Sequence, residues 1–334
     1  MRLRLILPLL VVASCLSAQA ASAYPWPIRP FDKQHPIRAN FGDPRTRFWN
    51  TLLTDGLQGP GMFQFHNGID ISAPEGTPVY PVISGTARLI DGTAVSVRTK
   101  GHGVFQYFHI VPTVVNGDHV VARRTVIGYV LKAFEHVHLT EIRAGRVWNP
   151  LARGGITPYR DATVPQVDAI VARPAASLVP IDPEHLCGTV SIVAAAHDTP
   201  PLRVPGTFAG FPVSPAFVTY SLEKIAGEVY VPGIPAADFR TTLPPVRRFW
   251  TVYARGSYQN APRFSNRQYF MPGRFLYSLG GLIDTRSYPN GNYEVSVQAS
   301  DMRGNESESV QQFTIANDMS SENGCPPQVP SSAP

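Results

Sequence analysis

Glycine divides the stretch from Phe65 to Arg143 into short apolar runs, and this spacing restricts what the chain can form. The runs are too short for typical helices, and several of them alternate apolar with polar residues. The glycines between them are Gly76, Gly85, Gly92, Gly101, Gly103, Gly117 and Gly128. Short alternating runs bounded by glycine are typical of antiparallel strands joined by turns. With 33 prolines and 27 glycines spread along the chain, we predict a mostly β fold.

The length and composition indicate two folded domains. The chain has 334 residues, of which 43% are hydrophobic and 16% are charged, which is enough apolar material for two cores. We place a first antiparallel β domain at residues 24–160. A stretch rich in proline, alanine and aspartate follows, and we interpret residues 161–184 as a linker.

A second β pattern occupies residues 185–318. Its last part alternates strictly from Tyr293 to Ala299, turns at Asp301–Asn305 and continues from Ser309 to Ile315. This closing hairpin resembles the end of immunoglobulin-like sandwiches, which implies a C-terminal β-sandwich domain. We interpret the aromatic-rich segment 240–286 as an insertion, and residues 319–334 as a disordered tail.

The first 23 residues have the organisation of an export signal. Arg2 and Arg4 precede an apolar run, and Ala21–Ala23 offers the small residues that signal peptidase requires. The run is too short to span a membrane, so we expect no transmembrane span after signal removal. Export to the periplasm, the cell envelope or the exterior follows. The alternative is a lipoprotein, because Val12–Cys15 resembles a lipidation box in which Cys15 would carry a lipid anchor.

The cysteine content and the net charge indicate the compartment of the protein and the class of its partners. Outside the signal only Cys187 and Cys325 remain, and in an oxidising compartment we expect them to form one disulfide. The alternative is two unpaired thiols. The net charge of +5 is not concentrated in any basic run, so we expect no nucleic-acid partner. An anionic cell envelope suits this charge better. The sequence does not indicate an oligomeric state.

Two polar side chains in the stretch FQFHNGIDIS could begin a metal site. His66 and Asp70 are four residues apart, and Gly68 allows the backbone to turn between them. Imidazole and carboxylate are ligands that zinc prefers, and catalytic zinc sites use three such groups. The alternative is a surface turn that happens to contain both residues.

The stretch EHVHL strengthens the metal interpretation. In a strand, residues two positions apart point to the same face, so His136 and His138 project together while Val137 and Leu139 face the core. A further histidine, His109, ends the aromatic strand QYFHI. Considered without the other motifs, His109 is interpreted as a core or edge histidine.

Taken in order, these motifs resemble the lysostaphin-type zinc endopeptidases, which cleave peptide cross-links in bacterial cell walls. The resemblance runs from Asn40 to Ile142 through HNGIDIS, YFHI, GDHV, VIGYV and HVH. It implies that one Zn²⁺ is bound by His66, Asp70 and His138. It also implies that His109 and His136 assist catalysis on peptidoglycan peptides. The implied fold is an antiparallel β-sheet metallopeptidase domain.

The chain departs from this family around the expected cleft. The segment 129–135 replaces the glycine- and threonine-rich loop before HVH, Arg123–Arg124 stands where a glycine is usual, and Leu139–Glu141 replaces an aromatic-glutamate pair. No expected ligand is lost, and zinc would activate a water for peptide hydrolysis. The alternative is a non-catalytic envelope protein that uses the same domain for binding or for regulating another hydrolase. A third hypothesis is a peptidase that cleaves proteins outside the cell wall.

Overall fold

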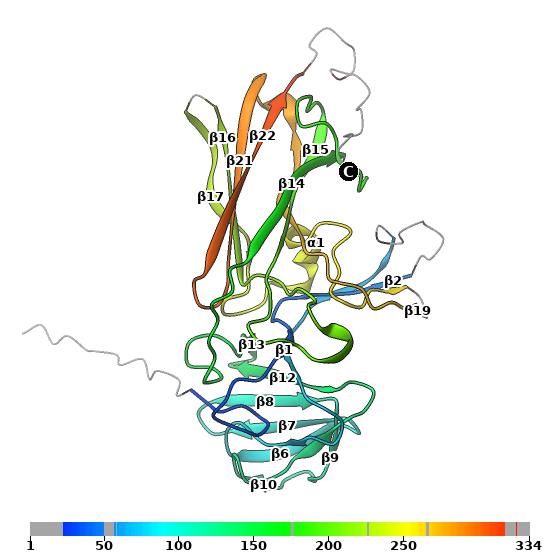
Figure 1. Ribbon diagram of the computed structural model, residues 1–334, viewed down its shortest axis with the longest axis vertical. Helices are drawn as coiled ribbons and strands as arrows, with labels where there is room; N and C mark the ends of the chain where they lie inside the picture. The colour runs from blue at the N-terminus through cyan, green and yellow to red at the C-terminus, as the bar shows by residue number, and fades with distance from the viewer. Residues whose placement is uncertain are drawn as a thin grey trace, which may run out of the picture.

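The computed structural model describes residues 23–49, 57, 59–174, 177–225, 227–264, 267–317 and 325. The predicted signal peptide lies outside these residues except for its last position, and so does the predicted tail except for Cys325. Figure 1 shows an elongated molecule with strand-rich units at its two ends and a strand arm projecting between them. Helix α1 (Phe249–Val252) is one turn long, and the 3-10 turns are Gly206–Phe208, Val246–Arg248 and Thr285–Ser287. The prediction of a mostly β fold is confirmed.

No helix in the described ranges has the length and apolar character needed to span a membrane.

The unit at the lower end in Figure 1 is built on an eight-stranded sheet. The strand order is β1 (Ile37–Ala39), β4 (Ile69–Ser72), β12 (His136–Arg143), β8 (Gly103–Phe108), β7 (Ala94–Thr99), β6 (Gly85–Asp91) and β10 (His119–Val120), with β13 (Arg146–Trp148) paired to β12. Every neighbouring pair is antiparallel. Phe105 and Tyr107 of β8 are fully buried, because alternate residues of a strand share the core face.

A three-stranded sheet shares the core of this unit. Its order is β5 (Pro78–Val79), β11 (Gly128–Val130) and β9 (Ile110–Pro112). Val79, Ile110 and Val130 are buried in the same core cluster as Phe105 and Tyr107. The apolar runs expected from the glycine spacing thus form two sheets around one core.

The unit at the upper end is a sandwich of two antiparallel sheets (Figure 1). The first has the order β14 (Gln166–Pro174), β15 (Thr189–His197) and β20 (Leu276–Asp284), and the second β17 (Glu228–Asp238), β16 (Phe217–Lys224), β21 (Gly291–Ser300) and β22 (Glu306–Ile315). Ile192 and Leu279 of the first sheet share a buried core with Val295 and Phe313 of the second. The hairpin expected at the end of the domain is the pair β21–β22.

Two sequence interpretations of this region are wrong. The expected linker 161–184 contains β14, whose Ile170 and Ala172 are buried at alternate positions. Pro174 ends this edge strand, where a missing N–H group is tolerated, so the proline-rich composition did not exclude a strand. The expected insertion 240–286 contains β20, which pairs with β15 inside the sandwich.

The projecting arm joins segments that are far apart in the sequence. It has the order β19 (Arg267–Gln268), β18 (Arg263–Phe264), β2 (Pro44–Phe48) and β3 (Gly61–Phe65). Only β18 and β2 pair in parallel. The arm therefore combines two strands from the N-terminal part of the chain with two from the C-terminal part.

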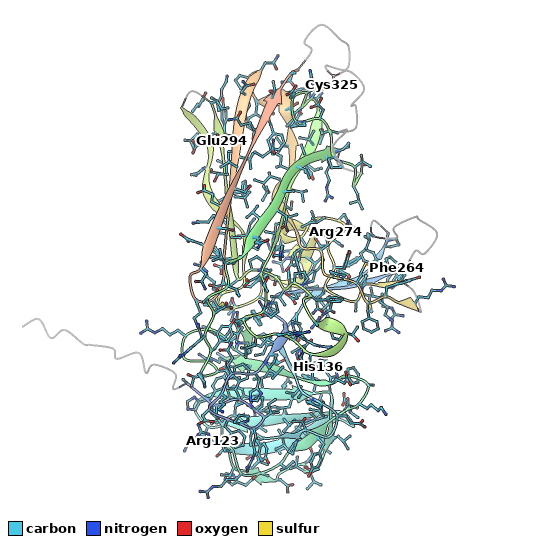
Figure 2. The ribbon with its side chains drawn as sticks, in the orientation of Figure 1. Arg123, His136, Phe264, Arg274, Glu294 and Cys325 are labelled. Carbon is cyan, nitrogen blue, oxygen red and sulfur yellow. A yellow bond between two sulfur atoms is a disulfide. The ribbon has the colours of Figure 1, made fainter. Side chains whose placement is uncertain are left out.

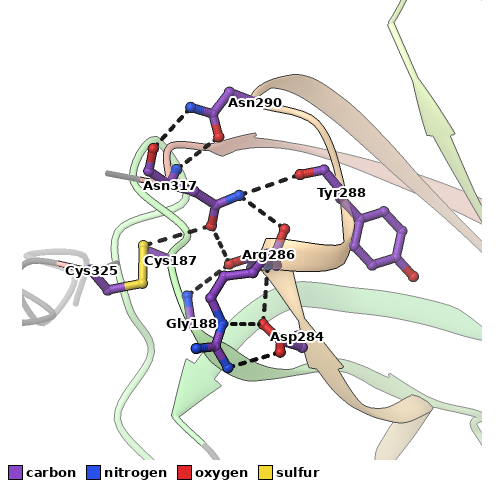
Figure 3. The surroundings of a disulfide bond; sticks show 9 residues. Cys187, Gly188, Asp284, Arg286, Tyr288, Asn290, Asn317 and Cys325 are labelled. Carbon is purple, nitrogen blue, oxygen red and sulfur yellow. Dashed lines mark hydrogen bonds and ion pairs between the residues drawn. A yellow bond between two sulfur atoms is a disulfide. The ribbon is translucent and has the colours of Figure 1, made fainter. Parts of the chain in front are cut away.

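A disulfide joins Cys187 to Cys325, as expected from the sequence. Figure 3 shows it beside Asn317, whose side chain accepts a hydrogen bond from the Thr285 hydroxyl at 2.7 Å and donates to the Thr285 carbonyl at 3.0 Å. The two cysteines are 138 positions apart in the sequence. The bond therefore joins the segment just before β15 to the C-terminal region of the chain. This end of the sandwich lies far from the junction between the two units (Figure 2).

Candidate metal centre

Three polar side chains meet where β3, β4 and β12 come together. His66 directly follows β3, Asp70 lies in β4 and His138 lies in β12. The antiparallel register places His138 opposite Asp70. At Gly68 a Cβ atom would lie 2.3 Å from the carbonyl oxygen of Leu139. Glycine therefore lets the chain between His66 and Asp70 pass close to β12.

The donor atoms of these side chains face one another. His66 Nε2 lies 3.1 Å from Asp70 Oδ1 and 2.8 Å from His138 Nδ1. His138 Nδ1 lies 2.9 Å from the same Asp70 oxygen. All three residues are buried. The structure thus brings together the three residues that the sequence comparison implied as zinc ligands.

Hydrogen bonds from outside this group orient its members. His66 Nδ1 lies 2.7 Å from the carbonyl oxygen of Asn40, which can only accept, so Nδ1 carries the proton and Nε2 presents a lone pair. His138 Nε2 lies 2.8 Å from Thr140 Oγ1, and a proton on Nε2 leaves a lone pair on Nδ1. Arg45 donates to Asp70 Oδ2 at 2.7 Å and leaves Oδ1 to face the imidazoles.

Burial and local charge set the protonation of the group. Burial lowers the pKa of His66 to about 3, with the charge of Arg45 acting in the same direction. Burial also lowers the pKa of His138. Burial opposes ionisation of Asp70, yet the groups around it, His136, His66 and Arg45, hold its pKa well below the usual range. At neutral pH the group therefore consists of two neutral imidazoles and one carboxylate.

This donor set fits a zinc ion. Zinc bonds of about 2.0–2.1 Å in a tetrahedron put neighbouring ligand atoms about 3.3 Å apart, a few tenths of an ångström more than the separations here. With the His66 proton on Nδ1 and a His138 proton on Nε2, two imidazole lone pairs and a carboxylate oxygen converge on one point. A cation relieves the mutual repulsion of such lone pairs. Three protein ligands also leave a fourth position free, as in catalytic zinc sites.

His136 lies beside this group, on the same face of β12 as His138. Its Nδ1 atom donates to the carbonyl oxygen of Phe134 at 2.7 Å, and its Nε2 atom is 3.4 Å from Asp70 Oδ1. Figure 2 places His136 at the junction between the lower unit and the rest of the molecule. The parity expected from the HVH stretch thus puts both imidazoles at the site.

His109 completes the cluster from the end of β8. Its backbone has a φ of 67°, in the left-handed region that non-glycine residues seldom adopt, and this turns the side chain toward the site. The ring stacks on Phe134 at 3.9 Å and lies 4.6 Å from the ring of His136. Burial, followed by the neighbouring His136, lowers the pKa of His109 to about 3. His109 is therefore a neutral imidazole at pH 7.

The cluster opens into a cleft of about 1040 Å³. One wall carries Ala133, Phe134 and Glu135, from the segment in which the sequence departs from the lysostaphin-type pattern. Residues of the arm also line the cleft, and Phe208 and Asn260 add residues from the C-terminal half of the chain. Both halves of the molecule therefore form the cleft.

Comparisons with known proteins find only distant structural similarity. No family model matches the chain, and no curated protein matches it. Among solved structures, the SpoIIQ–SpoIIIAH pore-forming complex is 19% identical, with a TM-score of 0.29 over 39% of this chain and 90% of the other. The catalytic domain of the A109H mutant of the prophage-encoded M23 protein EnpA from Enterococcus faecalis is 22% identical, with a TM-score of 0.25 over 34% and 92%.

LytU is 20% identical, with a TM-score of 0.27 over 36% of this chain and 86% of the other. At these TM-scores the likeness assigns no activity to the chain.

Several residues of the site were not found from the sequence. Asn40, Arg45 and Thr140 hold the three donor side chains, and Arg47 and Arg263 line the cleft. Thr140 continues the alternation of His136 and His138, so the strand period could have revealed it. Asn40 and the three arginines reach the site through contacts between distant segments, for which the local sequence carries no signal.

Proposed function

We propose that the chain is an exported zinc metalloendopeptidase that hydrolyses peptide bonds in bacterial peptidoglycan. The supporting observation is the convergence of His66 Nε2, Asp70 Oδ1 and His138 Nδ1 at the base of a cleft, with two further imidazoles beside them. The motif order shared with lysostaphin-type peptidases supports the wall substrate. The signal-like N-terminus and the positive net charge support action in an anionic envelope.

Bound zinc would polarise the scissile carbonyl and lower the pKa of a bound water toward about 7. His66, Asp70 and His138 would hold the ion, while Asn40, Thr140 and Arg45 keep their donor atoms aimed inward.

His109 and His136 supply the proton-transfer groups. His136 Nδ1 keeps its proton because it donates to the carbonyl oxygen of Phe134, so the Nε2 atom faces the site and can accept a proton there. His109 is neutral and stacked on Phe134, which fixes the plane of its ring. Such an imidazole can hydrogen-bond a developing oxyanion or return a proton to the leaving amine. The immunoglobulin-like sandwich would position the peptidase unit at the wall.

The test uses the mature full-length chain with peptidoglycan as substrate. We expect one zinc per chain by elemental analysis, and release of new amino groups from peptidoglycan. His66→Ala should lose both zinc and activity, whereas His109→Ala should keep zinc and lose activity. His185→Ala is the matched control, because this histidine is exposed and lies in the sandwich unit.

Two results would change the assignment. Full zinc occupancy without hydrolysis would favour the non-catalytic binding or regulatory role, and absence of zinc would contradict the site itself. Hydrolysis of soluble proteins in preference to peptidoglycan would redirect the substrate class. Identification of the newly exposed N-termini distinguishes a glycine bridge from a stem-peptide amine.

A further inference from the structure

Arginine dominates the charge of the cleft. Arg38 of β1, Arg45 and Arg47 of β2, and Arg263 of β18 line it. The carboxylates in its lining are Asp70 and Glu135. Asp70 already pairs with Arg45 and would also bind the proposed metal. The four arginines therefore give the cleft an excess of positive charge over its two carboxylates.

Two of these arginines lie side by side. Arg47 and Arg263 are register partners in the parallel pair of β2 and β18. Arg45 and Arg47 also share one face of β2, since they are two residues apart. Like charges placed next to each other on a sheet are destabilising unless an anion lies between them. The arm therefore carries a local concentration of positive charge on its cleft side.

Two arginines of the cleft, Arg38 and Arg47, have buried donors without acceptors. In the part of the chain that the structure describes, the Nε atoms of Arg38 and Arg47 are buried and have no hydrogen-bond partner. The nearest carboxylate oxygen to Arg38, Asp70 Oδ2, is 4.0 Å away and accepts from Arg45 instead. Arg38 is held in place by stacking on Phe208 at 4.2 Å. Buried donors of this kind favour a ligand that brings an acceptor.

We propose that this cleft binds peptides that carry a free carboxylate close to the scissile bond, and that Arg47, with Arg263 beside it, recognises the carboxylate. The inference rests on the proposed peptidase function and narrows its substrate class to anionic peptides. A guanidinium can pair with a carboxylate through two parallel hydrogen bonds, which a carboxamide cannot reproduce with the same charge. A neutral glycine bridge would leave the arginine donors unpaired.

The experiment compares two dansyl-labelled peptides, Gly-Gly-Glu-Gly-Gly and Gly-Gly-Gln-Gly-Gly, both amidated at the C-terminus. Binding to the zinc-loaded full chain is measured by fluorescence anisotropy, and hydrolysis is followed separately by amine release. We expect the glutamate peptide to bind at least about tenfold more tightly, as charge-assisted pairs in partly buried sites do. Added salt should reduce the difference.

Substitution of the cleft arginines tests which side chains cause the preference for the glutamate peptide. Arg47→Gln and Arg263→Gln should each remove most of it while zinc content stays unchanged. Because Arg263 is exposed, its substitution should leave folding intact even if Arg47→Gln does not. Arg98→Gln is the matched control, since Arg98 is exposed on β7 and does not line the cleft. Equal binding of the two peptides, or a glutamate preference that survives both cleft substitutions, would overturn the proposal.

The same measurements distinguish an error in the peptidase assignment from an error in the carboxylate site. A glutamate preference that depends on Arg47 and Arg263, without hydrolysis of either peptide or of peptidoglycan, would support the anionic site and contradict the peptidase assignment. Equal hydrolysis of both peptides would support the peptidase and overturn the carboxylate site.

Discussion

Ser214 donates two hydrogen bonds to a single oxygen of Asp43, from its backbone nitrogen at 2.9 Å and from its hydroxyl at 2.6 Å. The other Asp43 oxygen accepts from the backbone nitrogen of Asn40 at 3.0 Å. The Asn40 carbonyl in turn accepts from His66, and the Asn40 side chain donates to the Ser214 carbonyl. A residue from the C-terminal half of the chain thus supports the loop that orients a proposed zinc ligand.

Removal of the Ser214 hydroxyl should weaken both folding and metal binding. In Ser214→Ala the fully buried Asp43 carboxylate loses one donor, and we expect a loss of about 1–3 kcal/mol in the free energy of unfolding. Zinc affinity should also fall, because the Asn40 loop is less firmly held. Urea unfolding and zinc titration measure the two effects. Ser96→Ala removes a more exposed hydroxyl on β7 and should change neither.

Thr140 should tune the affinity for zinc through His138. Thr140→Val preserves the shape of the buried side chain and removes the hydroxyl that lies 2.8 Å from His138 Nε2. Loss of such an outer partner typically weakens metal binding by about 10–100-fold. Thr140→Ser retains the hydroxyl and should stay close to the parent. Equal zinc affinity in the valine and serine variants would show that Thr140 does not orient the imidazole.

Zinc should stabilise the folded chain. A ligand that binds only the folded state, present at about 100 times its Kd, adds about 2.7 kcal/mol. We therefore expect zinc to raise the Tm by several degrees and a chelator to reverse the increase. His138→Ala should abolish the response, whereas His185→Ala should keep it. An unchanged Tm on zinc addition to the metal-free parent would be inconsistent with the proposed ligands.

The disulfide should stabilise the sandwich without affecting the metal centre. A cross-link that closes 138 residues restricts the unfolded chain, and its loss is expected to lower stability by about 2–5 kcal/mol. The double variant Cys187→Ser and Cys325→Ser should show this loss in urea unfolding. Its zinc content should remain that of the parent, because Cys325 lies at the far end of the sandwich from His136 (Figure 2). Loss of zinc would reveal coupling between the two ends.

Asp198 should make stability fall as the pH rises. Burial, with the charges of Asp161 and Asp301 acting in the same direction, raises the pKa of Asp198 from 3.8 to about 8. Between these values the folded state keeps a proton that the unfolded chain has released, so the contribution of Asp198 to the free energy of unfolding decreases with pH up to about 8.

Asp198→Asn removes this titration and can still accept the hydrogen bond from the Thr199 nitrogen at 2.7 Å. We expect the variant to exceed the parent by more than about 1 kcal/mol at pH 8, and to show little gain near pH 4. Urea unfolding across this range provides the measurement, with the exposed Asp32→Asn as control. A difference between variant and parent that stays constant across the range would contradict the shifted pKa.

Local patterns in the sequence predicted the β architecture and the inner residues of the site. The alternation of HVHL fixed which side chains of β12 face the cleft, because neighbouring residues in a strand point to opposite sides. The HNGID stretch placed two donors around a glycine that must pass close to β12. The same local reasoning failed for β14, since an edge strand tolerates proline and needs only a few buried positions.

The tertiary structure alone decided how the site is supported and what lines its cleft. Asp43 accepts a hydrogen bond from Ser214, 171 positions away, and Arg47 pairs in register with Arg263 although more than 200 positions separate them. Local patterns in the sequence specify neither contact. Periodicity reports which face of a strand is buried, because it depends on adjacent residues. The approach of distant strands depends on how whole sheets pack, so the arginine-lined wall and the loop behind His66 emerge only in the folded molecule.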